Sequence, residues 1–302
     1  MITVETLNEK HGLAGKVKFY KGKGGLPTVA VNTKIASADI SLYGAHALSF
    51  IPAKQKDILW ISEKSLFEEG KAIRGGIPLC FPWFGPHPAD KTKPQHGFAR
   101  LQYWDVINVK EINDDTIDIE LCLQQSAASL QLWPYHFTAT AKFIIGKSLE
   151  LKLTVANTGN ETFEYSDALH TYFNISNIDS IAVEGLQSAT YYEAFGTDLK
   201  TQQSQLLYFN TETNRRYVNT AANCIIHDKE YDRKISVEKT GSKVTVVWNP
   251  AEATTKTIGD IVPDGYKKFI CVEPANAYAG IDIITLAPGQ SHTLSTKIKL
   301  TE

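Results

Sequence analysis

The segment FTATAKFIIGKSLELKLTVAN, residues 137–157, decides the fold class of this chain. Its two halves, Phe137–Ile145 and Leu149–Asn157, carry apolar residues at every second position, and Gly-Lys-Ser separates them. Side chains on a β-strand point alternately to the two faces of a sheet, so this period predicts two half-buried strands. The chain is therefore predicted to build its core from sheets with one apolar face.

Similar short runs continue the pattern on both sides of this segment. We predict further strands at Val17–Tyr20, Thr28–Asn32, Ile35–Leu42, Ala45–Ile51, Ile58–Ser62, Trp104–Val109, Thr116–Gln124, Thr162–Ser166, Ala182–Glu184, Cys224–His227, Lys234–Lys239, Lys243–Trp248, Lys268–Val272 and Gln290–Leu300. Helical pattern is confined to two short pieces, Lys64–Glu69 and Ser126–Leu132. Many short strands separated by turn residues indicate an all-β antiparallel sandwich or barrel. No repeat or linker divides the chain, so we expect one domain over residues 1–302, with Phe195–Asn223 as an irregular excursion.

Composition limits the classes of partner. The formal net charge of −2 provides no basic field that would attract nucleic acid or an anionic membrane. The N-terminus lacks the apolar run of a signal peptide, and no apolar stretch approaches bilayer-spanning length. Four scattered cysteines without a CxxC pair indicate buried free thiols (Cys80, Cys122, Cys224 and Cys271). We therefore expect a cytoplasmic protein, monomeric or dimeric, that contacts neither nucleic acid nor membrane.

The segment Gly70–Arg100 is the most prominent candidate for a functional loop. It contains five prolines, several glycines and four aromatic residues, a composition that restricts the backbone without providing a regular strand. Rigid loops on an all-β scaffold commonly carry binding residues. The polar residues Arg74, Gln95, His96 and Arg100 lie in this segment, and we expect them to line a pocket.

Five motifs in order make the chain recognisable: IRGGIPLCFPWFGPH, PQHGFAR, DALHTYF, VVWNP and CVEPANA. Together they resemble the aldose 1-epimerase superfamily, most closely its glucose-6-phosphate 1-epimerase (hexose-6-phosphate mutarotase) branch. The resemblance extends from about Ala36 to the C-terminus. It implies a galactose-mutarotase-like β-supersandwich whose enzymes interconvert the α and β anomers of an aldohexose without a cofactor or metal.

The resemblance also implies roles for individual residues. His170 in DALHTYF matches the general acid that protonates the ring oxygen, and Glu273 in CVEPANA matches the general base that deprotonates the C1 hydroxyl. Arg74, Gln95 and Arg100 match sugar- or phosphate-contacting positions, with His96 beside them. A histidine suits this chemistry because its ordinary pKa of about 6.5 allows both protonation states near neutrality.

Recognition of a phosphate is a separate prediction. Arg74 and Arg100 each offer a planar fork suited to bidentate phosphate binding, which favours a hexose 6-phosphate over a neutral sugar. One position departs from the family pattern, because Asn214 stands where an aspartate usually contacts the sugar. An amide oxygen still accepts a hydrogen bond but carries no charge. Glu212 and Asp232 are alternative carboxylates for that contact.

Other functions remain open from the sequence. A carbohydrate-binding protein without activity would bind sugar but would need no acid–base pair, and a mutarotase of neutral sugars would need fewer arginines. A glycoside hydrolase normally uses two carboxylates, so Asp167 would have to join Glu273. Metal-site motifs such as HExxH and HxH are absent, although distant histidines could still converge in the folded chain.

Overall fold

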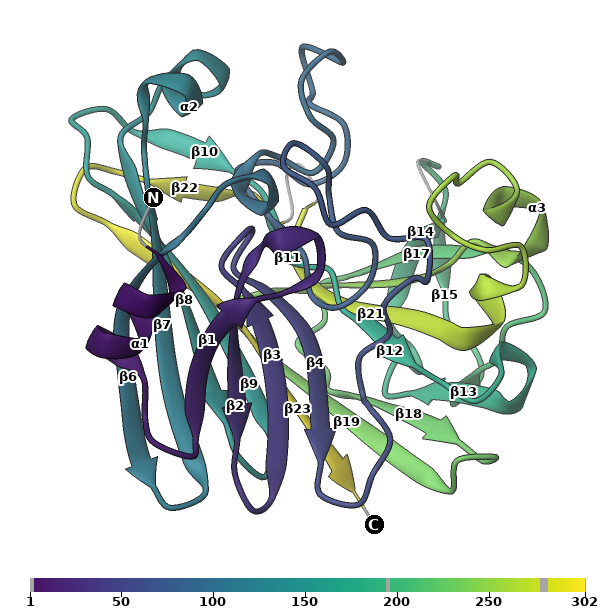
Figure 1. Cartoon of the computed structure of the whole chain (residues 1–302). Helices are drawn as coiled ribbons and strands as arrows, with labels where there is room; N and C mark the ends of the chain where they lie inside the picture. The colour runs from purple at the N-terminus through teal and green to yellow at the C-terminus, as the bar shows by residue number, and fades with distance from the viewer. Residues whose placement is uncertain (1–2, 194–195, 278–281, 302) are drawn as a thin grey trace.

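The computed structural model describes residues 3–193, 196–277 and 282–301, and antiparallel strands dominate it (Figure 1). The longest sheet has nine strands in the order β16-β13-β18-β19-β23-β9-β8-β7-β6. Its members are β6 (Asp105–Asn113), β7 (Thr116–Gln124), β8 (Phe137–Ile145), β9 (Leu149–Asn157), β13 (Ile181–Glu184), β16 (Leu206–Leu207), β18 (Cys224–Asp228), β19 (Arg233–Thr240) and β23 (Ser291–Thr301). The segment that decided the fold class forms the β8–β9 hairpin, which lies between β23 and β7 in this sheet.

The β8–β9 hairpin has the register that its apolar period requires. Phe137 lies opposite Asn157 and Ile145 opposite Leu149. Burial alternates along both strands, and the inward residues, from Phe137 to Val155, are fully buried. A shift of one residue would turn this whole apolar set to the solvent, so burial fixes the pairing.

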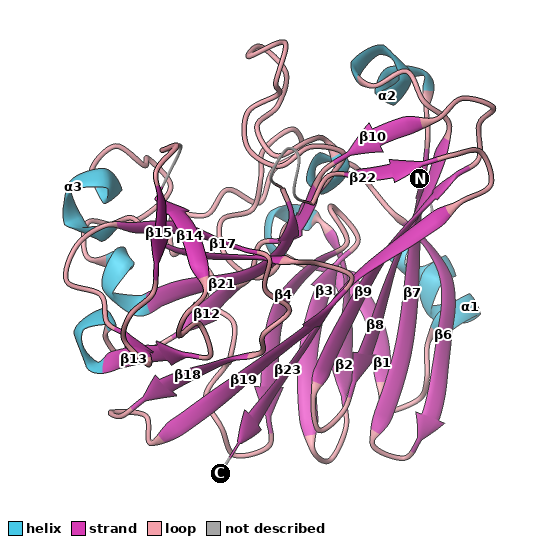
Figure 2. Cartoon of the chain, turned by 180° about the vertical axis from the view of Figure 1, so that it is seen from behind, coloured by secondary structure: helices cyan, strands magenta, loops and turns pink. Residues whose placement is uncertain are grey.

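Two further sheets cover the inner face of the nine-stranded sheet (Figure 2). The four-stranded sheet consists of β1 (Val17–Lys21), β2 (Pro27–Asn32), β3 (Ala36–Ser41) and β4 (His46–Pro52). The eight-stranded sheet runs in the order β15 (Leu199–Thr201), β14 (Thr190–Glu193), β17 (Thr213–Val218), β20 (Val244–Asn249), β21 (Phe269–Asn276), β11 (Asp167–Leu169) and β5 (Leu79–Cys80), with β12 (Tyr172–Asn174) also paired to β21. A small fourth sheet pairs β10 (Phe163–Tyr165) with β22 (Ile284–Leu286). One large apolar cluster lies between the layers.

Helices occupy little of the described chain. The α-helices are α1 (Val4–His11), α2 (Ala127–Leu132) and α3 (Ala251–Thr255), and short 3-10 turns lie at Lys23–Gly25, Ala99–Leu101, Ile178–Ser180 and Gly265–Lys268. Helix α2 confirms the expected short helix, and its N-cap Ser126 closes a capping box with Ser129. None of the helices in the described residues is long and apolar enough to cross a membrane.

Two expectations for residues 58–69 were wrong. Ile58–Ser62 is extended but pairs only through the single bridges Leu59↔Phe173 and Ile61↔Gly75. Lys64–Glu69 forms turns rather than a helix, because Ser62 and Ser65 bond nearby backbone groups instead. The Ser62 hydroxyl accepts from the Lys64 amide, and the Ser65 hydroxyl accepts from the Arg74 amide at 2.7 Å.

The expected irregular excursion, Phe195–Asn223, is more regular than predicted. Phe195 lies outside the described residues, but the remainder contains β15, β16 and β17. Strand β17 is an interior strand of the eight-stranded sheet, between β14 and β20. Asn214 and Arg216 therefore belong to a sheet face and not to a loop.

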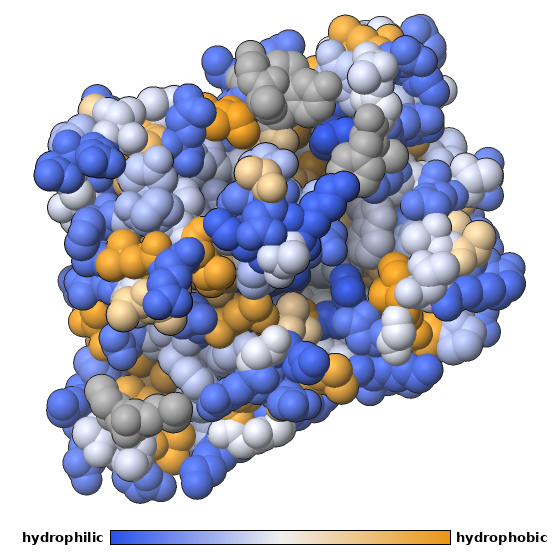
Figure 3. All heavy atoms as spheres, turned by 90° about the horizontal axis from the view of Figure 1, so that it is seen from above, coloured by the Kyte–Doolittle hydropathy of each residue, from blue (hydrophilic) through white to orange (hydrophobic). Residues whose placement is uncertain are grey.

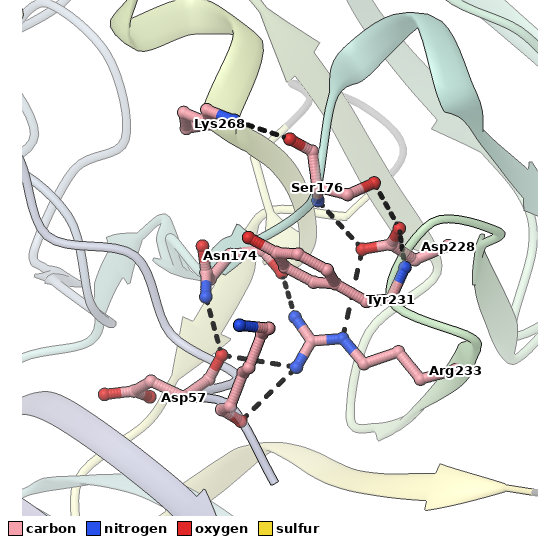
Figure 4. A network of polar contacts seen from close by, with 8 residues as sticks. Asp57, Asn174, Ser176, Asp228, Tyr231, Arg233 and Lys268 are labelled. Atoms are coloured by element: carbon pink, nitrogen blue, oxygen red, sulfur yellow. Dashed lines mark hydrogen bonds and ion pairs between the residues drawn. The ribbon is translucent and has the colours of Figure 1, made fainter.

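A buried arginine joins the nine-stranded sheet to the segments that lead into the eight-stranded one (Figure 4). The Arg233 guanidinium donates to the carbonyls of Lys56, Asp57 and Asn174, and its Nε lies 3.9 Å from Asp228 Oδ2. Asp228 in turn accepts from the amide and hydroxyl of Ser176. This network anchors β12, whose first residue, Tyr172, lies beside the candidate site.

We expect Arg233→Met to lower the free energy of unfolding by about 3 kcal/mol, because it leaves the buried Asp228 carboxylate without its ion-pair partner and removes the guanidinium donor from three carbonyls. Denaturant unfolding of wild type and variant measures this loss. Lys229→Met, an exposed change in the neighbouring turn, is the matched control. Equal stability of the two variants would contradict a structural role for the network.

Candidate active site

Four neighbouring strands of the eight-stranded sheet present two rows of side chains on one face. In the register, Arg216 lies opposite Val246, and Val246 lies opposite Glu273. Strand β11 pairs with β21 through Asp167 and Asn276, and β12 pairs with β21 through Tyr172 and Cys271. Both pairings have the same register, which sets His170 opposite Glu273. Two residues further along, the second row contains Asn214, Trp248, Cys271 and Tyr172. The chemistry-bearing residues thus converge because successive strands pair, although His170 and Glu273 are 103 positions apart in the sequence.

His170 and Glu273 form a buried pair at the centre of the first row. His170 Nδ1 lies 3.3 Å from Glu273 Oε1, and the two side chains are only 9% and 1% exposed. His170 Nδ1 and both Glu273 oxygens lack a hydrogen-bond partner among the described residues. Burial lowers the pKa of His170 well below its ordinary value, with the positive charges of Arg100 and Arg74 adding repulsion, and burial raises the pKa of Glu273 well above its own. Both shifts favour a His170–Glu273 pair of zero net charge, in which the two side chains share one titratable proton.

Aromatic rings fix the orientation of His170. Its ring stacks on Tyr172 at a centroid distance of 4.8 Å and an interplanar angle of 8°, and the Trp248 ring meets it edge-on at 5.9 Å. The His96 ring lies 5.5 Å away, nearly perpendicular. Packing of this kind removes rotamer freedom, so the imidazole is held in position before a ligand arrives.

Two glycines carry the chain past Arg74 into the site. A Cβ on Gly75 would lie 2.3 Å from the Trp60 carbonyl oxygen, and one on Gly76 would lie 2.2 Å from that of Ala47. Both residues also have positive φ, so only glycine fits between these two backbones. Arg74 Nε donates to both oxygens of Asp260, at 3.0 and 3.1 Å, and Nη1 donates to the Tyr172 hydroxyl at 2.9 Å.

His96 is held by the loop that contains it. Its φ is +61°, and its Nδ1 accepts from the Gly85 amide at 3.1 Å. Because burial lowers the pKa of His96 to about 3, the ring is neutral and the proton resides on Nε2. Nε2 faces the Gln95 side chain and is the atom able to donate to a ligand.

An open cavity of about 330 Å³ lies above these rows, a size typical of a small-molecule site. Among its lining residues are six of the seven predicted site residues: Arg74, Gln95, His96, His170, Asn214 and Glu273. Phe84, Val246, Trp248 and Ile258 supply apolar walls. Figure 3 views the molecule from the side of the Gly70–Arg100 loop and shows a hollow bordered mainly by hydrophilic residues.

Arg100 and the alternative carboxylates lie elsewhere. Arg100 is not among the lining residues, and its Nη2 donates to the Gln95 carbonyl at 2.7 Å, which braces the loop from behind. Glu212 accepts from the Thr254 hydroxyl at 2.5 Å outside this cavity, and Asp232 borders a separate cavity beside Arg233. Neither carboxylate replaces the amide of Asn214.

Arg216 lines the cavity, and sequence reasoning missed it. The signal was the period of two in Thr213–Val218, which sets Asn214 and Arg216 on one face and Arg215 on the other. The polar composition of Phe195–Asn223 predicts a loop, which hides this period. Asp260, the ion-pair partner of Arg74, was missed as well, because only the folded chain brings it near.

The family model for aldose 1-epimerase matches residues 27–299. The chain belongs to the aldose 1-epimerase family. It is 36% identical over 252 residues to the "Putative glucose-6-phosphate 1-epimerase" of Escherichia coli, covering 83% of this chain and 84% of that protein. These matches confirm the resemblance on which the enzyme prediction depended.

Solved structures agree with this assignment. The crystal structure of a "putative mutarotase" from Salmonella typhimurium superposes with a TM-score of 0.88 at 32% identity, over 97% of this chain and 96% of that one. The galactose 1-epimerase of Lactobacillus acidophilus superposes with a TM-score of 0.73 at 13% identity, over 95% and 99% of the two chains. The latter likeness concerns the fold alone and confirms the galactose-mutarotase-like all-β prediction.

Proposed function

We propose that this aldose 1-epimerase family member interconverts the α and β anomers of a hexose 6-phosphate. The observation that carries the proposal is the unpartnered His170–Glu273 pair, 3.3 Å apart at the floor of a cavity that two arginines also line. Sugar binding alone requires no buried acid–base pair. Relatives that bear the name glucose-6-phosphate 1-epimerase support the same substrate class.

The His170–Glu273 pair carries one titratable proton. Ring opening needs one proton for the ring oxygen and releases one proton from the C1 hydroxyl, so the pair ends the step with the same number. The opening step starts with the proton of the pair transferred from Glu273 to His170; His170 then donates it to the ring oxygen while the Glu273 carboxylate removes the proton of the C1 hydroxyl. The C1–O5 bond breaks, the C1 carbonyl forms, and the proton of the pair has moved from histidine to glutamate. Rotation about C1–C2 followed by the reverse transfers closes the other anomer. Burial supports both roles, because it makes the imidazolium a stronger acid and the carboxylate a stronger base.

The remaining lining residues suit a phosphorylated sugar. Arg74 and Arg216 place two guanidinium groups on the cavity wall; Asp260 holds Arg74 through Nε, and Asn214 adds no further negative charge. His96 Nε2 and the Gln95 amide can bond sugar hydroxyls, and Trp248 and Phe84 offer apolar faces for the ring carbons. We assign Arg100 to bracing the loop and not to ligand contact.

Two wider aspects belong to the same proposal. The four cysteines are free, three of them buried, which supports the reducing cytoplasm as the compartment. The family match from residue 27 to residue 299 supports a single domain.

The direct test is to add freshly dissolved α-glucose 6-phosphate and to follow its approach to anomeric equilibrium by NMR. We expect the enzyme to accelerate this approach well above the buffer rate. Galactose 6-phosphate, mannose 6-phosphate and the free hexoses serve as comparison substrates. The absence of acceleration with every one of them would refute the proposal, and preference for a free hexose would refute its phosphate part.

Arg216→Met should raise KM for the hexose phosphate by about 10–100-fold, the loss expected for one charge-assisted contact of about 1.5–3 kcal/mol. KM for the free hexose should change much less. Arg215→Met is the matched control, because Arg215 lies on the opposite face of β17 and pairs with Glu193. Equal increases of KM for both substrates would show that Arg216 does not contact the phosphate.

A further inference from the structure

A buried cysteine completes a group of three potential metal ligands, of which His170 and Glu273 line the cavity and Cys271 is fully buried next to them. His170, Cys271 and Glu273 each direct one donor atom into a common space, and all three atoms lie within 4.8 Å of one another. Cys271 and Glu273 are two residues apart on β21 and therefore share a face, and His170 lies opposite Glu273. Within the residues that the structure describes, this is the group of three such side chains whose donor atoms converge.

Two of these side chains have unsatisfied polar atoms. His170 Nδ1, Glu273 Oε1 and Glu273 Oε2 are buried without a hydrogen-bond partner among the described residues, and the two residues are 7% and 1% exposed. Unpartnered buried polar atoms are rare in folded proteins and call for a ligand that satisfies them. A sugar satisfies them during turnover, but their arrangement with a thiol also suits a different ligand.

We propose that His170, Cys271 and Glu273 bind a thiophilic divalent cation, Zn²⁺ or Cd²⁺, which inhibits the enzyme by occupying its acid–base pair. A thiolate, a carboxylate and a neutral imidazole together bring two negative charges, which balance the dication in a buried site. Binding displaces the thiol proton and the proton of the His170–Glu273 pair, and both leave to solvent. The inhibitory consequence rests on the proposed function, whereas cation binding does not.

Ligand type and geometry select the class of cation. Zn²⁺ binds sulfur at about 2.3 Å and nitrogen or oxygen at about 2.0–2.2 Å, usually with four ligands in tetrahedral geometry. Three donors from the protein leave the fourth position open toward the cavity, where water or a sugar hydroxyl can bind. Mg²⁺ and Ca²⁺ prefer all-oxygen sites and should not compete. The sequence gives no sign of this site, because the histidine and the cysteine lie on different strands far apart in the chain.

Cd²⁺ titration of the intact protein, followed by the ultraviolet charge-transfer band of cadmium thiolate, tests binding directly. Zn²⁺ titration by calorimetry and Zn²⁺ inhibition of anomerisation complete the test. We expect a thiolate band in wild type, its loss in Cys271→Ala, and inhibition that EDTA reverses. Removal of one ligand should weaken inhibition by Zn²⁺ at least about 10–100-fold, the loss that an outer-shell partner alone can cause. Each variant's inhibition is expressed relative to its own uninhibited rate.

Cys80→Ala is the matched control, because Cys80 is also a fully buried free thiol in the same sheet. It should retain both the cadmium band and Zn²⁺ inhibition. Equal inhibition of wild type and Cys271→Ala, a cadmium band that disappears in Cys80→Ala instead, or inhibition by Mg²⁺ as strong as by Zn²⁺ would each overturn the proposal. Cys271→Ser preserves side-chain volume and replaces Cys271→Ala if that variant fails to fold. Because the band and the calorimetry need no substrate, failure of the metal site is distinguishable from failure of the proposed enzyme activity.

Discussion

Replacement of Glu273 by Gln is expected to lower kcat for anomerisation by about 10²–10⁴-fold, the contribution of one well-placed general base. The amide has nearly the shape of the carboxyl group but cannot take the proton of the C1 hydroxyl. The pKa of Glu273 is raised by burial, so a neutral amide at this position resembles the protonated carboxyl in charge. The fold should therefore be preserved, and a thermal melt checks this. Initial rates with freshly dissolved α-hexose phosphate measure the loss.

Two comparisons make this result specific. His170→Asn should cause a loss of similar size, and the double variant should be little slower than either single variant, because the two groups act as a unit. Glu164→Gln on β10, an exposed change outside the cavity, should have no effect. A Glu273→Gln enzyme with wild-type kcat would remove this carboxylate from the mechanism.

The alternation of apolar and polar residues, which sets the strands, is visible in the sequence alone. The β8–β9 hairpin and its neighbours formed as expected because their side-chain pattern permits a single register against the core. The irregular Gly70–Arg100 segment was also predictable, since prolines and glycines exclude a regular ladder there. Helix α1 was missed because its sequence signal is short, a single N-cap in which the Thr3 hydroxyl accepts from the Thr6 amide. The contact that holds the helix, from Asn8 Nδ2 to the Phe19 carbonyl, exists only in the folded chain.

The site was less predictable than the fold, and the reason lies in strand pairing. Motif resemblance brought His170 and Glu273 together, but no property of either residue reveals that the register of β11 and β12 with β21 sets them opposite each other. Arg216 had no motif to carry it, and its position depends on β17 being an interior strand. Arg100 is the opposite case: its place in the Gly70–Arg100 loop predicted a ligand contact, but its guanidinium donates to the Gln95 carbonyl instead of lining the cavity.

A second carboxyl group on the same strands has a different role. Asp167 lies opposite Asn276, three register positions from the His170–Glu273 pair, and is fully buried. Its Oδ1 accepts from Asn276 Nδ2 at 2.9 Å. Asp167 Oδ2 and Asn276 Oδ1 are both buried acceptors without a partner among the described residues. A proton on Oδ2 turns one of these acceptors into a donor, and burial favours that proton by raising the pKa of Asp167 to about 7.

This shift makes stability depend on pH in a defined direction. In the unfolded chain Asp167 ionises near its ordinary pKa of about 3.9. Below that value both states are protonated, and the contribution of the group to folding is fully present. As pH rises from about 4 to 7, Asp167 ionises in the unfolded chain before it ionises in the folded protein, which lowers the free energy of the unfolded state. The contribution of Asp167 to stability is therefore lost over this range. The rise in pKa corresponds to about 4 kcal/mol at 1.36 kcal/mol per pH unit.

We therefore expect Asp167→Asn to become more stable relative to wild type as pH increases, by about 4 kcal/mol between pH 4 and pH 8. The amide cannot ionise, and two facing amides can form the same pair of hydrogen bonds as a carboxylic acid and an amide. Denaturant unfolding of both proteins across this pH range measures the difference, with the exposed Asp198→Asn as the control. A difference that stays constant with pH would mean that Asp167 is ionised in the folded protein. Strands β11 and β21 would then be joined at this position by a carboxylate and an amide that share a single hydrogen bond, and the backbone ladder would supply the rest of their register.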